Sequence, residues 1–136
     1  MLLAKDIMTT HVITIHRDTS IFDAIDLMVN NSITGIPVVK DESILVGIIS
    51  EQDVLRLLHT YEEEKDKPVS EFMTQPAIHF EQNEPVEDIC TCMMQNSIRR
   101  VPITSNGRVV GLISRSDILK QIQNLYKINW AVTSNC

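Results

Sequence analysis

The chain has 136 residues, 43% of them apolar and 22% charged, which is typical of a globular protein and excludes global disorder. Its net charge of −6 lies entirely in residues 1–68, and residues 69–136 are neutral overall, so the sequence offers no basic surface for duplex DNA or RNA. No apolar run reaches the roughly 20 residues that span a membrane. The N-terminus lacks the apolar region of a signal peptide. The chain has three cysteines, an odd number, which indicates a reducing compartment. We therefore expect a cytoplasmic protein.

The first half of the chain predicts one strand, one helix, two strands and a second helix. A short apolar stretch over Val12–Ile15 predicts the first strand. The next apolar residues recur at the spacing of one helix face, with a start at Ser20. These face residues are Ile21, Ala24, Ile25 and Met28. Two apolar runs, Ile36–Val39 and Leu45–Ile49, predict a strand pair, and a second helix is expected to start at Ser50.

The second half predicts the same order after a charged linker, Tyr61–Pro68. The expected strands are Ala77–Phe80, Val101–Thr104 and Val109–Ile113. The first helix of this half should carry Val86, Ile89, Cys90 and Met93 on its apolar face, starting at Glu84 with Pro85 in its first turn. Asn106-Gly107 is a strong hairpin signal. Ser114 is the expected start of the last helix.

The two halves are copies of one unit. When Ile7–Val39 is placed over Phe72–Thr104, nine of 33 positions are identical, and six of 13 are identical for Val46–Leu58 over Val110–Ile122. The expected fold class is α/β, with two β-α-β-β-α motifs packed with pseudo-twofold symmetry into one module. The expected divisions are a first motif at 1–60, an acidic linker at 61–69, a second motif at 70–125 and a C-terminal tail at 126–136.

The sharpest repeated pattern is a Ser followed three residues later by an Asp, where a strand runs into a helix. It occurs at Ser50 and Asp53, and again at Ser114 and Asp117, each time with a Gly three residues before the Ser. One interpretation is a capping box that closes the helix start. The other is a ligand site, since a helix N-terminus attracts phosphate and a carboxylate accepts from a ribose hydroxyl. In that interpretation the glycine permits close approach of the ligand.

This repeat resembles the CBS motif, and the tandem resembles a stand-alone CBS pair, or Bateman module. The resemblance covers roughly residues 4–125. It rests on three segments in the same order, twice: Ile7-Met8-Thr9, Gly35-Ile36-Pro37-Val38 and Gly47-Ile48-Ile49-Ser50-Glu51-Gln52-Asp53 in the first copy, and Phe72-Met73-Thr74, Arg100-Val101-Pro102-Ile103 and Gly111-Leu112-Ile113-Ser114-Arg115-Ser116-Asp117 in the second.

The resemblance implies two clefts between the motifs that bind AMP, ADP, ATP or another adenosyl ligand. In each cleft the base contacts one motif, and the Ser/Asp segment of the other motif contacts the ribose and phosphate. The residues it implies for the first, preferred cleft are Ile13, Thr34, Ile36, Pro37, Arg99, Arg100, Ser114, Ser116 and Asp117. The residues it implies for the second, weaker cleft are Ile78, Ile98, Val101, Pro102, Ser50 and Asp53.

Charge sets the expected preference between the clefts. Arg99 aligns with a family position that contacts phosphate, and Arg100 and Arg115 lie close to it in sequence. In the second cleft Glu51 takes the place of Arg115, and a carboxylate repels phosphate. We therefore expect the Asp117 cleft to bind phosphorylated adenosine more tightly.

No enzyme chemistry is expected. The sequence has no catalytic constellation, no Walker-type loop and no metal-ligand spacing, so we expect neither a catalytic cofactor nor a metal. Cys90 and Cys92 lie two apart on a helix and point in different directions, which favours packing over metal binding.

The expected function is a regulatory, ligand-sensing module that modulates a separate partner protein and has no nucleic-acid or membrane partner. The second helices are broadly apolar, and the resemblance implies homodimers formed through them. The tail, with the only tryptophan, Trp130, is expected either to pack on the dimer, to contact another protein or to fray. The alternatives are a constitutive dimerisation or protein-interaction module with vestigial clefts, and a sensor of S-adenosylmethionine or NADH.

Overall fold

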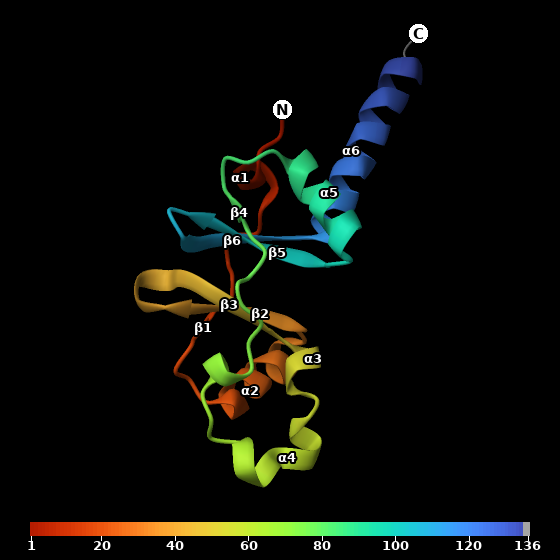
Figure 1. Cartoon of the computed structure of the whole chain (residues 1–136). Coiled ribbons are helices and arrows are strands. Elements are labelled where there is room, and N and C mark those ends of the chain that lie inside the picture. Colours follow the sequence, from red (N-terminus) through yellow and green to blue (C-terminus); the bar gives the residue numbers. More distant parts are fainter. Residues whose placement is uncertain (135–136) are drawn as a thin grey trace.

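The computed structural model describes residues 1–134, with side chains through Trp130. The predicted β-α-β-β-α order is present twice (Figure 1). The first copy consists of β1 (Ile15–His16), α2 (Ile21–Asn31), β2 (Gly35–Lys40), β3 (Ile44–Ser50), α3 (Glu51–Val54) and α4 (Leu57–Glu64). The second copy consists of β4 (Phe80–Glu81), α5 (Val86–Asn96), β5 (Arg100–Ser105), β6 (Arg108–Ser114) and α6 (Arg115–Ser134). A short helix, α1 (Ala4–Ile7), and two 3₁₀ turns, η1 (Asp41–Ser43) and η2 (Val69–Glu71), complete the chain.

The two leading strands are shorter than the sequence predicts. Of Val12–Ile15 only Ile15 is in a strand, and of Ala77–Phe80 only Phe80 is. Each of these strands has one parallel neighbour, β2 or β5, and pairs with it through two residues only. The preceding apolar residues are therefore left outside the ladder.

The helix starts are largely as predicted. Ser20 caps α2, and its side chain accepts a hydrogen bond from the backbone N–H of Asp23. The second helices begin at Glu51 and Arg115, directly after Ser50 and Ser114. The prediction for α5 was wrong by one residue, because Pro85 has an extended backbone and lies before the first turn.

The helix α4 extends as far as Glu64, into the segment predicted to be a linker. The Glu64 side chain is only 14% exposed and pairs with Arg56 at 3.1 Å. Two hydrogen bonds lower the pKa of Glu64. The bond from Thr60 has the larger effect and the bond from Arg56 the next largest. These contacts tie the last turn of α4 to the start and middle of the same helix.

The turn chemistry predicted for the second hairpin is confirmed. Asn106 and Gly107 both have positive φ, 53° and 82°, as a two-residue turn between twisted strands requires. The first copy has no glycine at this place and is one residue longer. It turns through η1, with Glu42 and Ser43 at positive φ.

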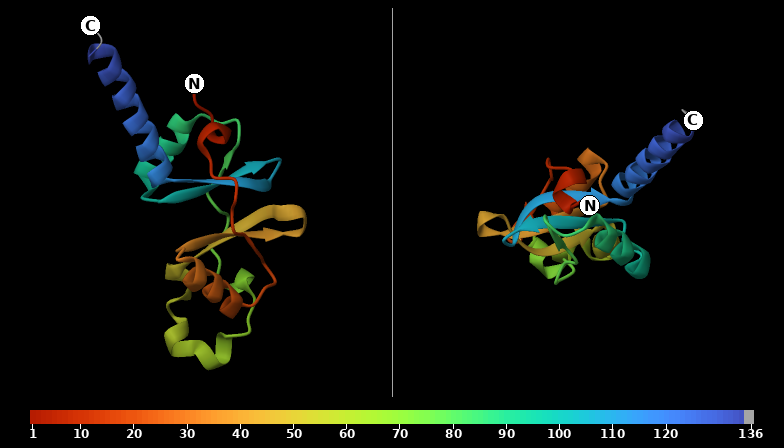
Figure 2. Two further views of the ribbon diagram at one scale, coloured as in Figure 1. Left: turned by 180° about the vertical axis from the view of Figure 1, so that it is seen from behind. Right: turned by 90° about the horizontal axis from the view of Figure 1, so that it is seen from above.

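The six strands form one sheet with the symmetric order β1-β2-β3-β6-β5-β4. Its halves are joined in the middle by the pairing of Ile44 with Arg108 and by a 2.7 Å ion pair between Arg108 and Glu42. Away from this junction the halves separate into two layers that face each other, with helices on their outer sides (Figures 1 and 2). The predicted pseudo-twofold packing is confirmed.

Each motif completes its core with a segment from the other end of the sequence. The red N-terminal segment in Figure 2 starts beside the second motif and crosses to the first. Ala4 is fully buried in the core of the second motif, where Met8 packs against it. Val69 and Phe72, which precede β4 at the start of the second copy, are buried in the core of the first motif. Neither core is therefore built from one sequence repeat alone.

No helix in the part of the chain that the structure describes is long and apolar enough to cross a membrane.

Candidate functional site

The two Ser/Asp pairs form capping boxes at equivalent strand-to-helix junctions. Oδ2 of Asp117 accepts hydrogen bonds from the backbone N–H and the Oγ–H of Ser114, at 2.8 and 3.0 Å. Oδ2 of Asp53 accepts the same two bonds from Ser50, at 2.9 and 3.0 Å. The capping interpretation is therefore confirmed, and it leaves one oxygen of each carboxylate, Oδ1, for another donor.

The Oδ1 atoms of Asp53 and Asp117 differ in whether a hydrogen-bond donor already occupies them. Oδ1 of Asp53 accepts a hydrogen bond from the Thr74 hydroxyl at 3.3 Å. The equivalent threonine, Thr9, makes no such bond to Asp117, and Oδ1 of Asp117 has no donor among the described residues. Asp117 thus keeps a free acceptor on a half-buried side chain.

The repeated glycines make room for the protein's own chain. A Cβ at Gly47 would lie 2.7 Å from Sδ of Met73 and 2.8 Å from the carbonyl oxygen of Thr74. A Cβ at Gly111 would lie 2.7 Å from Cγ of Met8. Our interpretation of these glycines as ligand contacts was therefore wrong, because the exchanged segments described above pack on them.

A cavity of about 260 Å³, here called the Ser114 cavity, lies between the two layers. Its apolar wall comes mainly from the first motif, with Leu112 added from the second. Of its polar residues, Thr9 and His11 come from the N-terminal segment, and Arg100 and Ser114 from strand ends of the second motif. It is lined by Thr9, His11, Val12, Ile13, Ile33, Gly35, Pro37, Arg100, Leu112 and Ser114. Four residues predicted for the first cleft meet here: Ile13, Pro37, Arg100 and Ser114.

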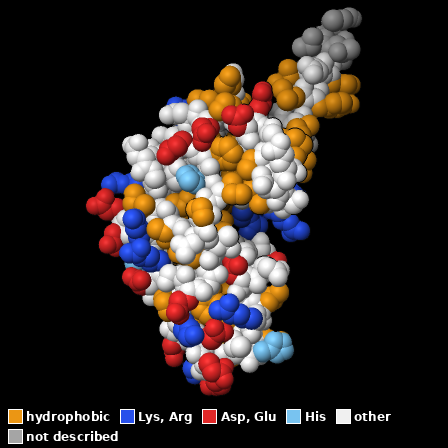
Figure 3. All heavy atoms as spheres, viewed as in Figure 1, with side chains coloured by type: hydrophobic (Ala, Val, Ile, Leu, Met, Phe, Trp, Pro, Cys, Tyr) orange, Lys and Arg blue, Asp and Glu red, His pale blue; other side chains and the backbone are white. Residues whose placement is uncertain are grey.

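A second cavity of about 450 Å³, here called the Ser50 cavity, lies beside the first and shares Gly35 and Arg100 with it. It is lined by Thr34, Gly35, Ile48, Ser50, Glu51, Gln52, Ser97, Ile98, Arg99 and Arg100. Two residues predicted for the second cleft, Ser50 and Ile98, meet here. Figure 3 shows Lys or Arg side chains in a hollow between the two halves of the molecule.

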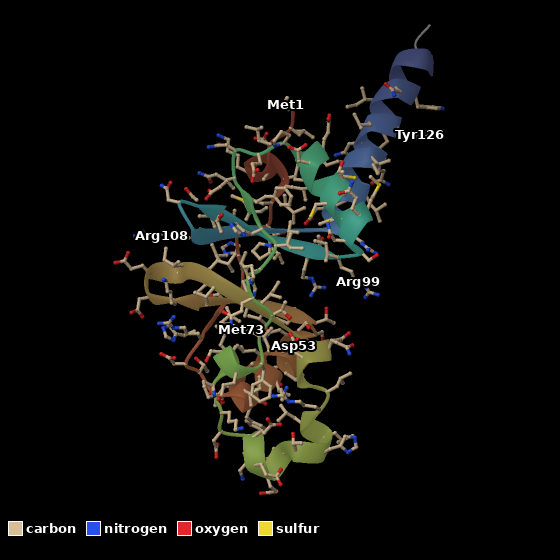
Figure 4. The ribbon with its side chains drawn as sticks, viewed as in Figure 1. Met1, Asp53, Met73, Arg99, Arg108 and Tyr126 are labelled. Atoms are coloured by element: carbon tan, nitrogen blue, oxygen red, sulfur yellow. The ribbon has the colours of Figure 1, made fainter. Side chains whose placement is uncertain are left out.

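The arginines are distributed differently from the expectation. Arg99 lines the Ser50 cavity and not the Ser114 cavity, and Figure 4 shows it extending from just before β5 toward the first motif's layer. Arg100 lies between the cavities and donates to the Thr34 hydroxyl at 2.7 Å. Arg115 points elsewhere: its Nε donates to the carbonyl oxygen of Ile98, and it lines a hollow between α5 and α6. The charge argument that placed Arg99 and Arg115 in the Asp117 cleft is thus not supported by the geometry.

Several other predicted residues do not line either cavity. Ile36 and Val101 are fully buried in the two cores, and Pro102 is fully buried in β5. Ile78 is 45% exposed, and Ser116 is exposed beside the cap. Thr34, predicted for the first cleft, differs from these residues because it does line a cavity, the Ser50 cavity and not the Ser114 cavity. Asp53 and Asp117 stand one hydrogen bond behind the serines that line the walls.

Sequence reasoning missed Thr9, the second residue of the Met8-Thr9 pair, and His11, two residues further on. Thr9 and His11 line the Ser114 cavity because Thr9 pairs with Leu112 of β6, which draws the N-terminal segment across the layers. The repeat of Thr9 at Thr74 was the available signal, since Thr74 pairs with Ile48 in the same way.

Among the described residues, no three His, Cys, Asp or Glu side chains are grouped so as to hold a metal ion. Cys90 lies in the apolar hollow between α5 and α6, and Cys92 is a half-buried free thiol on the same helix.

The fold and the paired cavities define a tandem module of the CBS type. The family model described as "CBS domain" matches residues 4–60 and 69–124, so the chain belongs to the CBS-domain family as a tandem pair. It is 31% identical over 131 residues to the uncharacterized protein MJ1225 of Methanocaldococcus jannaschii. The match covers 96% of this chain and 46% of that relative, so the chain spans about half the relative's length.

Two solved structures share the fold. The structure of CBSX2, a CBS-pair protein from Arabidopsis thaliana, in complex with AMP has a TM-score of 0.81 and 25% identity, covering 93% of this chain and 99% of that one. The CBS domain pair of protein MJ0100, in complex with 5'-methylthioadenosine and S-adenosyl-L-methionine, has a TM-score of 0.76 and 31% identity, covering 91% and 98%. CBS pairs that resemble this chain therefore bind adenosyl ligands.

Proposed function

We propose that this CBS pair is a regulatory module that binds an adenine nucleotide, AMP, ADP or ATP, between its two motifs and does no chemistry on it. The observation that carries the proposal is the free Oδ1 of Asp117, whose other oxygen is bonded to Ser114, a residue that lines the Ser114 cavity. A carboxylate oxygen at that place is a suitable acceptor for a ribose hydroxyl. The adenosyl ligands of CBSX2 and MJ0100 support the same ligand class.

The walls of the Ser114 cavity suit the parts of such a ligand. Val12, Ile13 and Pro37 give an apolar surface for a flat base. The Arg100 guanidinium donates to Thr34 through one nitrogen, and its remaining N–H groups are donors for phosphate oxygens. The preferred cleft is thus still the Asp117 cleft, on the ground of its free acceptor and no longer because of Arg99.

The Ser50 cavity is the weaker site in this proposal. Its carboxylate, Asp53, is already fully engaged by Ser50 and Thr74. Arg99 and Arg100 line it, but so does Glu51, which opposes a second negative charge. A ligand whose phosphates extend past Arg100 would reach Arg99 from the neighbouring cavity.

The regulated partner is a separate protein, and the module acts on it as a homodimer. Because a ligand shifts only equilibria between states that it binds differently, the nucleotide must change the relative position of the motifs or the affinity for that partner. Expected partners are the enzymes, transporters or regulators whose activity follows adenylate levels.

The test compares Asp117→Ala with its matched control, Asp53→Ala, by isothermal titration calorimetry with AMP, ADP, ATP, S-adenosylmethionine, NADH and GTP. Loss of a hydrogen bond to a charged group costs about 1.5–3 kcal/mol, so Asp117→Ala should bind the preferred adenine nucleotide roughly 10- to 150-fold more weakly. Asp53→Ala should bind it nearly as well as the parent, although both variants lose a helix cap.

Equal affinity of the parent and Asp117→Ala would contradict the site assignment. Binding of S-adenosylmethionine or NADH in preference to AMP, ADP and ATP would change the ligand. No binding of any of these compounds would favour a constitutive interaction module.

A further inference from the structure

Arg100 lies at the boundary between the Ser114 cavity and the Ser50 cavity. Among the residues that the structure describes, only Gly35 and Arg100 line both cavities. Arg100 is half-buried at the start of β5, and within the described part of the chain it makes no ion pair with a carboxylate. A partly buried cation without a counterion favours an anion beside it, because the anion offsets part of the lost hydration.

The Arg100 side chain crosses from the second motif to the first and is held there. Its Nη1 donates to Oγ1 of Thr34 at 2.7 Å. The same side chain passes over Gly35, since a Cβ on Gly35 would lie 3.4 Å from Nη1 and 4.0 Å from Cδ of Arg100. A hydroxyl of one motif therefore fixes the position of a cation that the other motif contributes.

The repeat supplies this cation only once. In the alignment of the two copies Thr34 is equivalent to Arg99, and Gly35 is equivalent to Arg100. Among the described residues that line the Ser114 cavity, Arg100 is the only Arg or Lys. A phosphate in that cavity therefore has one guanidinium available to it, and the placement of this guanidinium decides how well the phosphate is bound.

An arginine side chain has several rotatable bonds, so a free guanidinium loses rotamer freedom when it binds a phosphate. The Thr34 hydroxyl engages one N–H of Arg100 and leaves its other N–H groups for phosphate oxygens. We propose that Thr34 is a positioning residue, which holds the Arg100 guanidinium at the Ser114 cavity before the ligand arrives. Because folding has already ordered Arg100, the cavity gains affinity for a phosphorylated adenosyl ligand and none for the nucleoside. This proposal rests on the proposed function and deepens it, since it names a residue that sets the preference for phosphate.

The test is isothermal titration calorimetry of the parent, Thr34→Val and Thr34→Ser with AMP and with adenosine. Valine has nearly the shape of threonine without the hydroxyl, so Thr34→Val should bind AMP roughly three- to tenfold more weakly and adenosine within about twofold of the parent. Thr34→Ser keeps the hydroxyl and should keep the parent's ratio of AMP affinity to adenosine affinity. A purely structural role of Thr34 would instead weaken both ligands together.

A double-variant cycle shows whether Thr34 acts through Arg100 or on the ligand directly. In the Arg100→Gln background, Thr34→Val should cause no further loss of AMP affinity, because the group that Thr34 positions is gone. The matched control is Thr91→Val, since Thr91 is an exposed threonine on α5 whose hydroxyl donates to the carbonyl oxygen of Glu87. This control should bind both ligands as the parent does.

Circular dichroism checks that each variant is folded, and Thr34→Ala repeats the test with a smaller side chain. Three results would overturn this proposal alone: unchanged AMP affinity in Thr34→Val, equal losses for AMP and adenosine, or an undiminished loss in the Arg100→Gln background. A parent that binds neither AMP nor adenosine would overturn it together with the proposed function, so the two failures are distinguishable.

Discussion

Asp53 and Asp117 occupy the same place in the two repeats, but their surroundings give them different capacities. Each is held by its capping serine, and only Asp53 receives a further hydroxyl, from Thr74. Under the proposed function, a structural role and a binding role coexist in the Asp117 carboxylate, with one oxygen for each. At this scale a capping box and a ligand site are not competing explanations.

Gly47 and Gly111 allow a prediction about stability. Gly47→Ala should destabilise the fold by about 2–3 kcal/mol, because its Cβ would meet the Thr74 carbonyl, which is fixed by backbone bonds to Ile48. Gly111→Ala should cost about 1 kcal/mol, because the Met8 side chain can move. Urea unfolding measures both.

Gly35→Ala is the control for this pair, since its Cβ would be 3.4 Å from the nearest atom, on the flexible Arg100 side chain. A larger loss for Gly35→Ala than for Gly47→Ala would refute the explanation by close chain packing.

The elements exchange partners across the middle of the chain. Residues 1–9 complete the second motif and residues 69–74 complete the first, so each lead segment packs away from the helices and strands that follow it in sequence. The exchange ties the two motifs together more strongly than the single pairing of β3 with β6 does. The sequence repeat and the structural core are therefore offset from each other.

Hydrogen exchange measured by mass spectrometry can detect this offset. Phe72→Ala should remove about 3–5 kcal/mol of packing and speed exchange first in β2 and β3 of the first motif. Met8→Ala should speed exchange first in β5 and β6 of the second motif. If each variant instead loosened the strands nearest to it in sequence, the exchanged packing would be wrong.

On the scale of the whole molecule, both cavities lie between layers contributed by different motifs. A nucleotide that contacts both layers binds only when the two motifs are packed together. Its binding free energy therefore adds to the stability of the two motifs as one unit.

An adenine nucleotide at 100 times its dissociation constant should stabilise the fold by about 2.7 kcal/mol and raise the unfolding temperature by several degrees. Because the Ser114 cavity uses residues 9–13 and 33–37 as well as Arg100, Leu112 and Ser114, exchange should slow in both motifs together. Differential scanning calorimetry and hydrogen exchange measure these effects. Protection confined to one motif would argue against a bridging ligand.

The sequence by itself determined the repeat, the β-α-β-β-α order, the hairpin turn at Asn106-Gly107 and the helix starts at Ser50 and Ser114. These depend on local backbone preferences and on periodicity, which the residues carry with them. Only the tertiary structure decided the direction of Arg99, the burial of Ile36 and Val101, and the purpose of Gly47 and Gly111. Each of these depends on which distant segment lies opposite. The crossing of residues 1–9 to the second motif is a long-range packing choice that no local pattern in those residues specifies.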